Sequence, residues 1–248
     1  MKQSKLERDL AIVSPILAKA EVDSYSLCPC EVYALLNVYN VAFHDSGKIE
    51  GIASLDSSCS GCEFCQKMRE AAKHDDTIIC GKCYDAKLES YRTNIKDRHT
   101  LNLRIMSTVL FTVEELKSVP SMELDRINSS GDIANLIHAR NMIRYAKAHP
   151  FAHVTIWSKN YPVMQKAFEI EGKPNNMIYV ASSIRINEKI ALPAFADYTF
   201  TVYTKDKIAE AIANGSMTCN GAKCRDCGFK CYYGTWPKGS DIAEVLRP

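Results

Sequence analysis

Eleven cysteines in four groups constrain this 248-residue chain more than any other feature of its sequence. The groups are Cys28 with Cys30, the triplet Cys59, Cys62 and Cys65, the pair Cys80 and Cys83, and the quartet Cys219, Cys224, Cys227 and Cys231. No cysteine lies between Cys83 and Cys219, so the groups flank a long cysteine-free segment. Because eleven is an odd number, the cysteines cannot all pair in disulfides within one chain.

The remaining composition favours metal ligation over disulfide bonding. Hydrophobic residues make up 46% of the chain and charged residues 24%, and a chain of this length and composition buries a core without staples. Ser14 and Pro15 interrupt the only apolar stretch near the N-terminus, so we expect neither a signal peptide nor a membrane span. We therefore expect a cytoplasmic protein, in a compartment where thiols stay reduced.

The C-terminal quartet has the spacing C-x4-C-x2-C-x3-C and predicts a bound [4Fe–4S] cluster. Four thiolates this close in sequence can surround one small inorganic core, because short loops suffice to wrap it. Tetrahedral zinc also accepts four thiolates, but zinc ribbons usually join two knuckles through a longer insert. Zinc, and redox-active or incidental thiols, stay open as alternatives for this group.

The triplet repeats the opening of the bacterial ferredoxin run C-x2-C-x2-C-x3-C, but Arg69 stands at its fourth position. Cys80 or Cys83 could supply the fourth ligand of a second cluster, as could Cys28 or Cys30. A site with three thiolates would leave one iron open to a substrate or a cofactor such as S-adenosylmethionine. A zinc ribbon that uses the last two triplet cysteines with the pair is the alternative.

Between the cysteine groups, strand-like runs alternate with helical periodicity, which predicts an α/β fold with a mostly parallel sheet or a partial (βα) barrel. We expect strands at 122–128, 153–157, 177–182 and 197–203, and helices at 133–148, 161–169 and 207–213. Further helices are expected at 31–43 and, as one or two, within 86–110. The expected organisation is one domain over 1–248, with a cysteine-rich region at 28–100, a βα core at 101–214 and a cysteine-rich cluster segment at 215–248.

Polar residues follow the predicted strands, where parallel α/β sheets carry their working groups. They predict a catalytic pocket, and Ser130, Gly131 and Asp132 are the candidate cofactor contacts. Such residues also serve as ordinary turn formers and helix caps, but their recurrence after successive strands favours a functional role. The candidate catalytic residues are Asp132, Lys159, Asn160 and Arg185.

Several of these motifs together resemble one family. The stretch Arg126-Ile-Asn-Ser-Ser-Gly-Asp132 resembles the R-I-H-x-S-G-D element of the phage "gene product eighty-eight" family. The segments at 80–86, 150–160 and 224–231 resemble that family's Cys-Tyr-Ala, Tyr-Thr-Lys and closing cysteine elements. The family has no assigned chemistry, and the resemblance implies one α/β domain with the first and last cysteine groups on one side of a sheet. Asn128 stands where the family usually has His, and Trp157-Ser158 where it has Tyr-Thr.

More distantly, the chain is similar to radical S-adenosylmethionine enzymes, which pair a three-cysteine cluster with a partial barrel. The Ser130-Gly131-Asp132 element resembles the glycine–acid element of those enzymes, but their C-x3-C-x2-C triplet is absent.

We therefore expect an iron–sulfur protein with two [4Fe–4S] clusters and redox or cluster-based catalysis, an oxidoreductase whose substrate is unknown. An electron-transfer partner is compatible with this function, and no membrane partner is expected. The alternatives are a zinc-stabilised module that binds nucleic acid or protein, and a non-catalytic cluster carrier. The net charge of +2 is small for a nucleic-acid-binding protein, although it does not exclude one.

Overall fold

The structure is a computed structural model that describes residues 4–22, 26–219 and 223–246. One sheet of eight strands organises it, in the order β1-β2-β3-β4-β5-β6-β8-β7. The strands are β1 (Ala42–Phe43), β2 (Ala53–Leu55), β3 (Leu124–Ile127), β4 (His153–Ser158), β5 (Met177–Ser182), β6 (Tyr198–Tyr203), β7 (Met217–Thr218) and β8 (Asp241–Val245). Only β1 is antiparallel to its neighbour, so the predicted mostly parallel sheet is confirmed.

Strands β2 to β6 are neighbours in the order in which they occur along the chain, as in a (βα) barrel. Their carboxyl ends therefore meet at one edge of the sheet. The last strand, β8, inserts between β6 and the short β7. Its Asp241 is fully buried and accepts hydrogen bonds from Thr199, Thr201, Tyr203 and Ser216, which fix β8 against β6.

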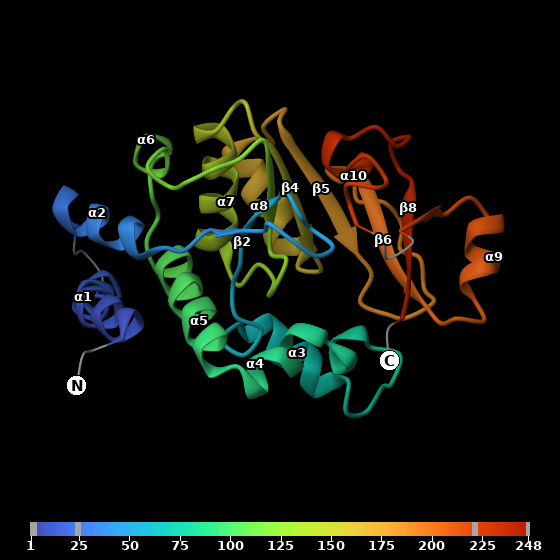
Figure 1. The fold of residues 1–248 in the computed structure, drawn as a ribbon, viewed down its shortest axis with the longest axis horizontal. Coiled ribbons are helices and arrows are strands. Elements are labelled where there is room, and N and C mark those ends of the chain that lie inside the picture. Colours follow the sequence, from blue (N-terminus) through green and yellow to red (C-terminus); the bar gives the residue numbers. More distant parts are fainter. Residues whose placement is uncertain (1–3, 23–25, 220–222, 247–248) are drawn as a thin grey trace.

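Helices cover both the sheet and its carboxyl edge (Figure 1). They are α1 (Lys5–Ala20), α2 (Pro29–Val38), α3 (Glu63–Ala71), α4 (Tyr84–Tyr91), α5 (Thr93–Thr108), α6 (Val113–Leu116), α7 (Leu136–Ala148), α8 (Tyr161–Glu171), α9 (Ile208–Ala213) and α10 (Lys230–Tyr233), with a 3-10 helix at Ile79–Lys82. Figure 1 shows α7 and α8 together beside the sheet, and α3 and α4 below it. The C-terminal end of β8 runs down toward α3 in the same view.

The βα core agrees closely with its sequence pattern. Helix α7 begins where the Asn135 side chain accepts a hydrogen bond from the His138 amide, and it buries Met142 and Ile143 at helical spacing. Strand β4 lies between α7 and α8 in the sequence. It pairs with β3 so that Thr155 is opposite Arg126. The predicted strands at 122–128, 153–157, 177–182 and 197–203 are all present with shifts of one or two residues at their ends.

The N-terminal part is more regular than we expected from its sequence. Helix α1 runs unbroken through Pro15, and Ser4 and Glu7 form a capping box at its start. The helix expected at 31–43 ends earlier, at Val38, and is followed by β1. In the described part of the chain, no helix is long and apolar enough to span a membrane.

Candidate metal and substrate site

A cavity of about 480 Å³ opens at the carboxyl edge of the sheet and is lined by cysteines from both ends of the chain. The N-terminal groups contribute Cys59, Cys65, Cys80 and Cys83, and the quartet contributes Cys219, Cys224 and Cys231. Segments more than a hundred residues apart in sequence therefore present thiols to one open cavity. This is the arrangement that the family resemblance implied.

The triplet lies in the loop that leaves β2 and enters α3. Cys62 caps α3, since its thiol accepts a hydrogen bond from the Cys65 amide at 3.5 Å. The Cys59 and Cys83 sulfurs are 3.9 Å apart. These two sulfurs and a carboxylate oxygen of Asp85 all lie within 4.8 Å of one another, close enough to share a metal ion. The triplet and Cys83 thus lie in one cluster of thiols, and that this cluster binds a metal stays a prediction.

Mutual hydrogen bonding sets the protonation of this thiol cluster. Hydrogen bonds from Cys65 and Cys83 lower the pKa of Cys59, and a hydrogen bond from Cys65 lowers the pKa of Cys62. The pKa values of Cys65 and Cys83 are raised, because each thiol donates to Cys59. Burial, and then the Cys59 thiolate, raise the pKa of Asp85 to about 7. A metal ion that binds here would displace the protons of the remaining thiols.

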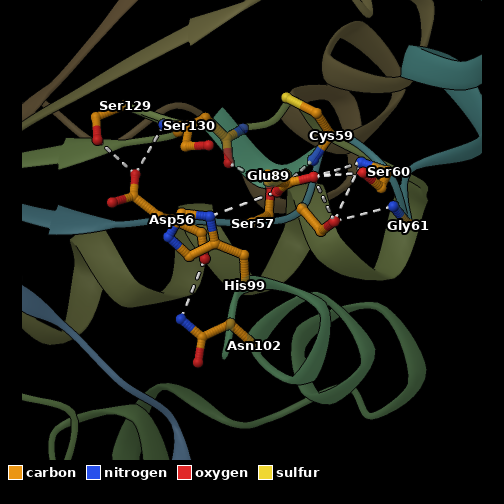
Figure 2. Close-up of polar contacts among 12 residues, drawn as sticks. Asp56, Ser57, Cys59, Ser60, Gly61, Glu89, His99, Asn102, Ser129 and Ser130 are labelled. Atoms are coloured by element: carbon orange, nitrogen blue, oxygen red, sulfur yellow. Dashed lines mark hydrogen bonds and ion pairs between the residues drawn. The ribbon is translucent and has the colours of Figure 1, made fainter. Parts of the chain in front are cut away.

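The buried carboxylate of Glu89 holds the cysteine loop in place (Figure 2). It accepts hydrogen bonds from the backbone amides of Cys59 at 3.1 Å and Ser60 at 2.9 Å, and from the Ser60 hydroxyl at 2.6 Å. The His99 ring lies 3.5 Å from the same carboxylate. Ser58 donates to Glu89 and accepts from the amide of Gly61, which closes the turn. The loop is therefore fixed by charge-assisted hydrogen bonds before any metal binds.

A second buried carboxylate, Asp56, joins the ends of β2 and β3. It accepts hydrogen bonds from the Ser129 hydroxyl at 2.6 Å and from the Ser130 amide at 2.9 Å (Figure 2). The backbone at Gly131 has φ +86°, and an added Cβ would meet the Ser57 hydroxyl oxygen at 2.2 Å. Glycine is therefore required where the loop after β3 crosses the loop after β2.

The quartet surrounds the other side of the cavity. The Cys219 amide donates to Ala243 of β8, and the Cys224 amide donates to Lys48, both at 2.8 Å. The Cys227 thiol donates to the Cys224 carbonyl at 3.1 Å. Burial raises the pKa of Cys231 to about 12, so this thiol is protonated without a metal. Residues 220–222, between Cys219 and Cys224, lie outside the described residues.

Cys28 and Cys30 form a disulfide with each other at the start of α2. Neither lines the cavity. This pair is therefore oxidised, contrary to our expectation that the thiols of this chain are reduced. The sequence did not assign a role to either cysteine.

Two of the four residues predicted to be catalytic line the cavity. Asp132 is buried and accepts hydrogen bonds from the Ser158 hydroxyl and the Lys159 amide. Burial raises the pKa of the Asp132 carboxyl. Burial opposes the charge on Lys159, but Asp132 and then Cys80 attract it, and its pKa is raised. Asp132 and Lys159 thus provide a carboxyl and an ammonium group at the predicted edge.

The other two lie outside the lining. Asn160 is buried and donates through its side chain to the Ile133 carbonyl at 2.9 Å, so it joins two loops. Arg185 is 44% exposed at its side chain and pairs with Asp75 in the segment after α3. Of the predicted cofactor contacts, Gly131 and Asp132 line the cavity, whereas Ser130 does not.

The sequence interpretation assigned no site role to several residues that line the cavity. Arg126 lies 5.0 Å from the centre of the Trp157 ring, and its Nη1 lies 3.5 Å from the Tyr232 hydroxyl. Asn128 is 4% exposed and adopts a left-handed conformation with φ 58°. The sequence indicated these residues only through the motifs that contain them, the Arg126-to-Asp132 and Trp157-Ser158 elements.

The fold and the site define an α/β protein whose cysteines gather in a cavity at the carboxyl edge of a mostly parallel sheet. Residues 39–229 match the family described as Gene product 88, and the chain belongs to that family. This match confirms the resemblance that the sequence motifs carry. Comparisons with curated proteins and with solved structures found no match.

Proposed function

We propose that this protein is an iron–sulfur redox enzyme that holds two [4Fe–4S] clusters beside one substrate cavity. The observation that supports the proposal is the convergence of both cysteine groups on a single cavity of about 480 Å³. A cavity of this size is large enough for a small-molecule substrate. Two redox centres that face one volume suit either electron transfer between them or electron delivery to a bound molecule.

In this proposal Cys59, Cys62, Cys65 and Cys83 hold the N-terminal cluster. Cys83 is preferred to Cys80 as the fourth ligand, because its sulfur is 3.9 Å from that of Cys59. The quartet Cys219, Cys224, Cys227 and Cys231 holds the second cluster. The donor set is chemically suitable: nine cysteines outside the disulfide are free, and seven of them line the cavity.

Bound clusters would supply one-electron transfer to or from the substrate. The chain's own residues would bind and orient that substrate. Lys159 and Arg126 are the cations of the strand edge that face the cavity, and Asp132 fixes Lys159 through its backbone amide. The Asp85 carboxyl, whose pKa of about 7 lies near physiological pH, can hold or release a proton beside Cys59 and Cys83.

S-adenosylmethionine is a possible cofactor if only the triplet holds the N-terminal cluster. The triplet follows the first parallel strand and Ser130-Gly131-Asp132 follows the next, an order similar to that of radical S-adenosylmethionine enzymes. The nearness of Cys83 to Cys59 instead favours four thiolate ligands.

A zinc-stabilised module that binds protein or nucleic acid is the second candidate. The mixed set of Cys59, Cys83 and Asp85 favours it, because zinc accepts both thiolates and carboxylates. In that case the protein would bind zinc, have no visible absorption and unfold when a chelator removes the metal.

Metal analysis of protein purified without oxygen tests the proposal. We expect about eight irons and matching sulfide per chain, with a visible absorption that bleaches on reduction. Zinc in place of iron, persisting after anaerobic reconstitution with iron and sulfide, would contradict the proposal. Addition of S-adenosylmethionine to the reduced protein should leave the electron paramagnetic resonance spectrum unchanged if four thiolates hold each cluster.

A further inference from the structure

Buried hydrogen-bond donors without partners gather on one wall of the cavity. The Nε of Arg126, the Nδ2 of Asn128 and the indole Nε1 of Trp157 have no hydrogen-bond partner among the described residues. All three residues line the cavity. Buried polar groups are normally satisfied, so several unpartnered donors at one place indicate that something else accepts from them.

The structure holds each donor in position. The Asn128 carbonyl oxygen accepts a hydrogen bond from the Ser57 hydroxyl at 3.1 Å, which leaves the amide nitrogen free to donate. Arg126 stacks over Trp157, whose ring in turn packs edge-on against Phe200 at 4.9 Å between centroids. Thr155, paired in register with Arg126, has a fourth unpartnered buried atom, its hydroxyl oxygen.

The three cavity-lining groups are donors only, and one of them belongs to a permanent cation. We propose that Arg126, Asn128 and Trp157 bind an oxyanion, the carboxylate or phosphate group of the small molecule that occupies the cavity. The identification of this molecule as substrate rests on the proposed redox function. The anion site itself does not depend on which metal the cysteines bind.

The acidic residues of the cavity do not supply the missing acceptors. Asp132 already accepts from Ser158 and from the backbone, and Glu244 forms an ion pair with Lys48 at 2.8 Å. Asp85 lies among the thiols of the triplet and the pair. Lys159, Arg69 and Lys82 add further cations to the lining of the same cavity. An anion that accepts from Arg126 is therefore favoured electrostatically as well as by hydrogen bonding.

Arg126 has one other possible role, which is to balance the negative charge of the quartet. Its charge acts on Cys231 and Cys224. Charge balance, however, requires neither the amide of Asn128 nor the indole nitrogen of Trp157. Substitutions at these two positions therefore separate anion binding from metal retention.

Equilibrium dialysis of the metal-loaded full chain against labelled phosphate, and separately against labelled malonate, tests the site. We expect saturable binding of at least one probe, and which one binds distinguishes a phosphate from a carboxylate ligand. Asn128→Asp keeps the acceptor for Ser57 but turns a carboxylate toward the anion, and should weaken binding at least tenfold. Trp157→Phe keeps the ring under Arg126 and should weaken binding several-fold.

The chain offers a matched control for each variant. Asn187 is also left-handed, with φ 64°, and its side-chain oxygen accepts from Thr204, so Asn187→Asp introduces the same charge outside the cavity. Trp236, the second tryptophan, lies outside the lining, so Trp236→Phe should leave binding unchanged. Iron, zinc and sulfide contents are measured for every variant.

The outcomes separate this proposal from the redox function. Loss of anion binding with full metal content, in Asn128→Asp but not in Asn187→Asp, supports the site. Anion binding by a chain that contains only zinc keeps the site and rejects the redox function. No saturable binding of either probe to the unsubstituted protein, or equal binding by Asn128→Asp and Asn187→Asp, overturns the site.

Discussion

The thiols of Cys59 and Cys83 lie 3.9 Å apart although 24 residues separate them in the chain. Cys80, three residues earlier, also lines the cavity, but Cys59 acts on it through charge and not through a hydrogen bond. The short distance to the Cys59 sulfur distinguishes Cys83 from Cys80, which the spacing of the cysteines in the sequence does not do.

The first prediction concerns the fourth ligand of the N-terminal cluster. Cys83→Ser should lower the iron and sulfide content by about half, because one of two clusters loses a ligand. Cys80→Ser is the matched control and should keep both clusters. Iron and sulfide analysis with electron paramagnetic resonance of the reduced protein measures the difference, and the reverse pattern would make Cys80 the ligand.

The second prediction concerns Glu89, which is 1% exposed and accepts from the backbone of the cysteine loop. Glu89→Gln should lower the free energy of unfolding by about 2 kcal/mol, because an amide cannot accept all of these hydrogen bonds. Urea denaturation measures the change. Glu63→Gln, at an exposed carboxylate paired with Lys67 on α3, should give no measurable change. Equal effects of both substitutions would contradict the role of Glu89.

The third prediction concerns two glycines with positive φ. Gly131→Ala should lower the free energy of unfolding by about 3 kcal/mol or more. The new methyl group would clash with Ser57, and the positive φ is unfavourable for alanine. Gly172→Ala, with φ 71° and open space around its Cβ, should cost only about 1 kcal/mol. Thermal or urea unfolding of both variants checks the comparison. A similar cost at both positions would show that the loops after β2 and β3 separate easily.

The fourth prediction concerns the pH dependence of stability. Burial lowers the pKa of His138 from 6.5 to about 4, so the folded protein keeps this ring neutral while the unfolded chain protonates it. Stability should therefore fall as the pH falls from 6.5 to 4, by about 3 kcal/mol from this residue alone. Unfolding of His138→Gln across this range should show a weaker dependence. An unchanged slope would assign the acid sensitivity to other groups.

The fifth prediction compares the two cations among the candidate catalytic residues, Lys159 and Arg185. Lys159 lines the cavity, whereas Arg185 pairs with Asp75 on the surface. Lys159→Gln should weaken the binding of whichever probe, phosphate or malonate, the unsubstituted protein binds, and Arg185→Gln should not. Equilibrium dialysis measures probe binding by both variants. Loss of binding in Arg185→Gln would show that Arg185 belongs to the anion site.

The fold was predictable where elements are long enough to carry a period. Helix α7 and strands β4 and β5 have clear patterns and short polar connections, so their sequence determined both type and place. Strand β2 has three residues, too few to show alternation, and β8 lies within the segment 215–248, where we predicted a cysteine-rich cluster segment and no strand. Helix α1 was missed because Pro15 interrupts the pattern near the middle of the helix.

The site was predictable only in part, because sequence order indicates which residues follow a strand but not which way they turn. Asp132 and Lys159 follow β3 and β4 and enter the cavity. Asn160 is the N-cap residue that precedes α8, and Arg185 forms a β-bridge with Ile78 and does not line the cavity. Arg126 lies within a strand, where alternation alone does not show which face meets the cavity.

The position of β8 has a consequence for the order of events during synthesis. Residues 241–245 are translated after the seven cysteines that line the cavity, yet they form the strand that joins β6 to β7 and contribute to the cavity wall. A nascent chain that has released only its first 240 residues from the ribosome lacks that wall and the strand that anchors Cys219. Since folding units are completed as their last elements emerge, this part of the cavity wall forms only after residues 241–245 have left the ribosome.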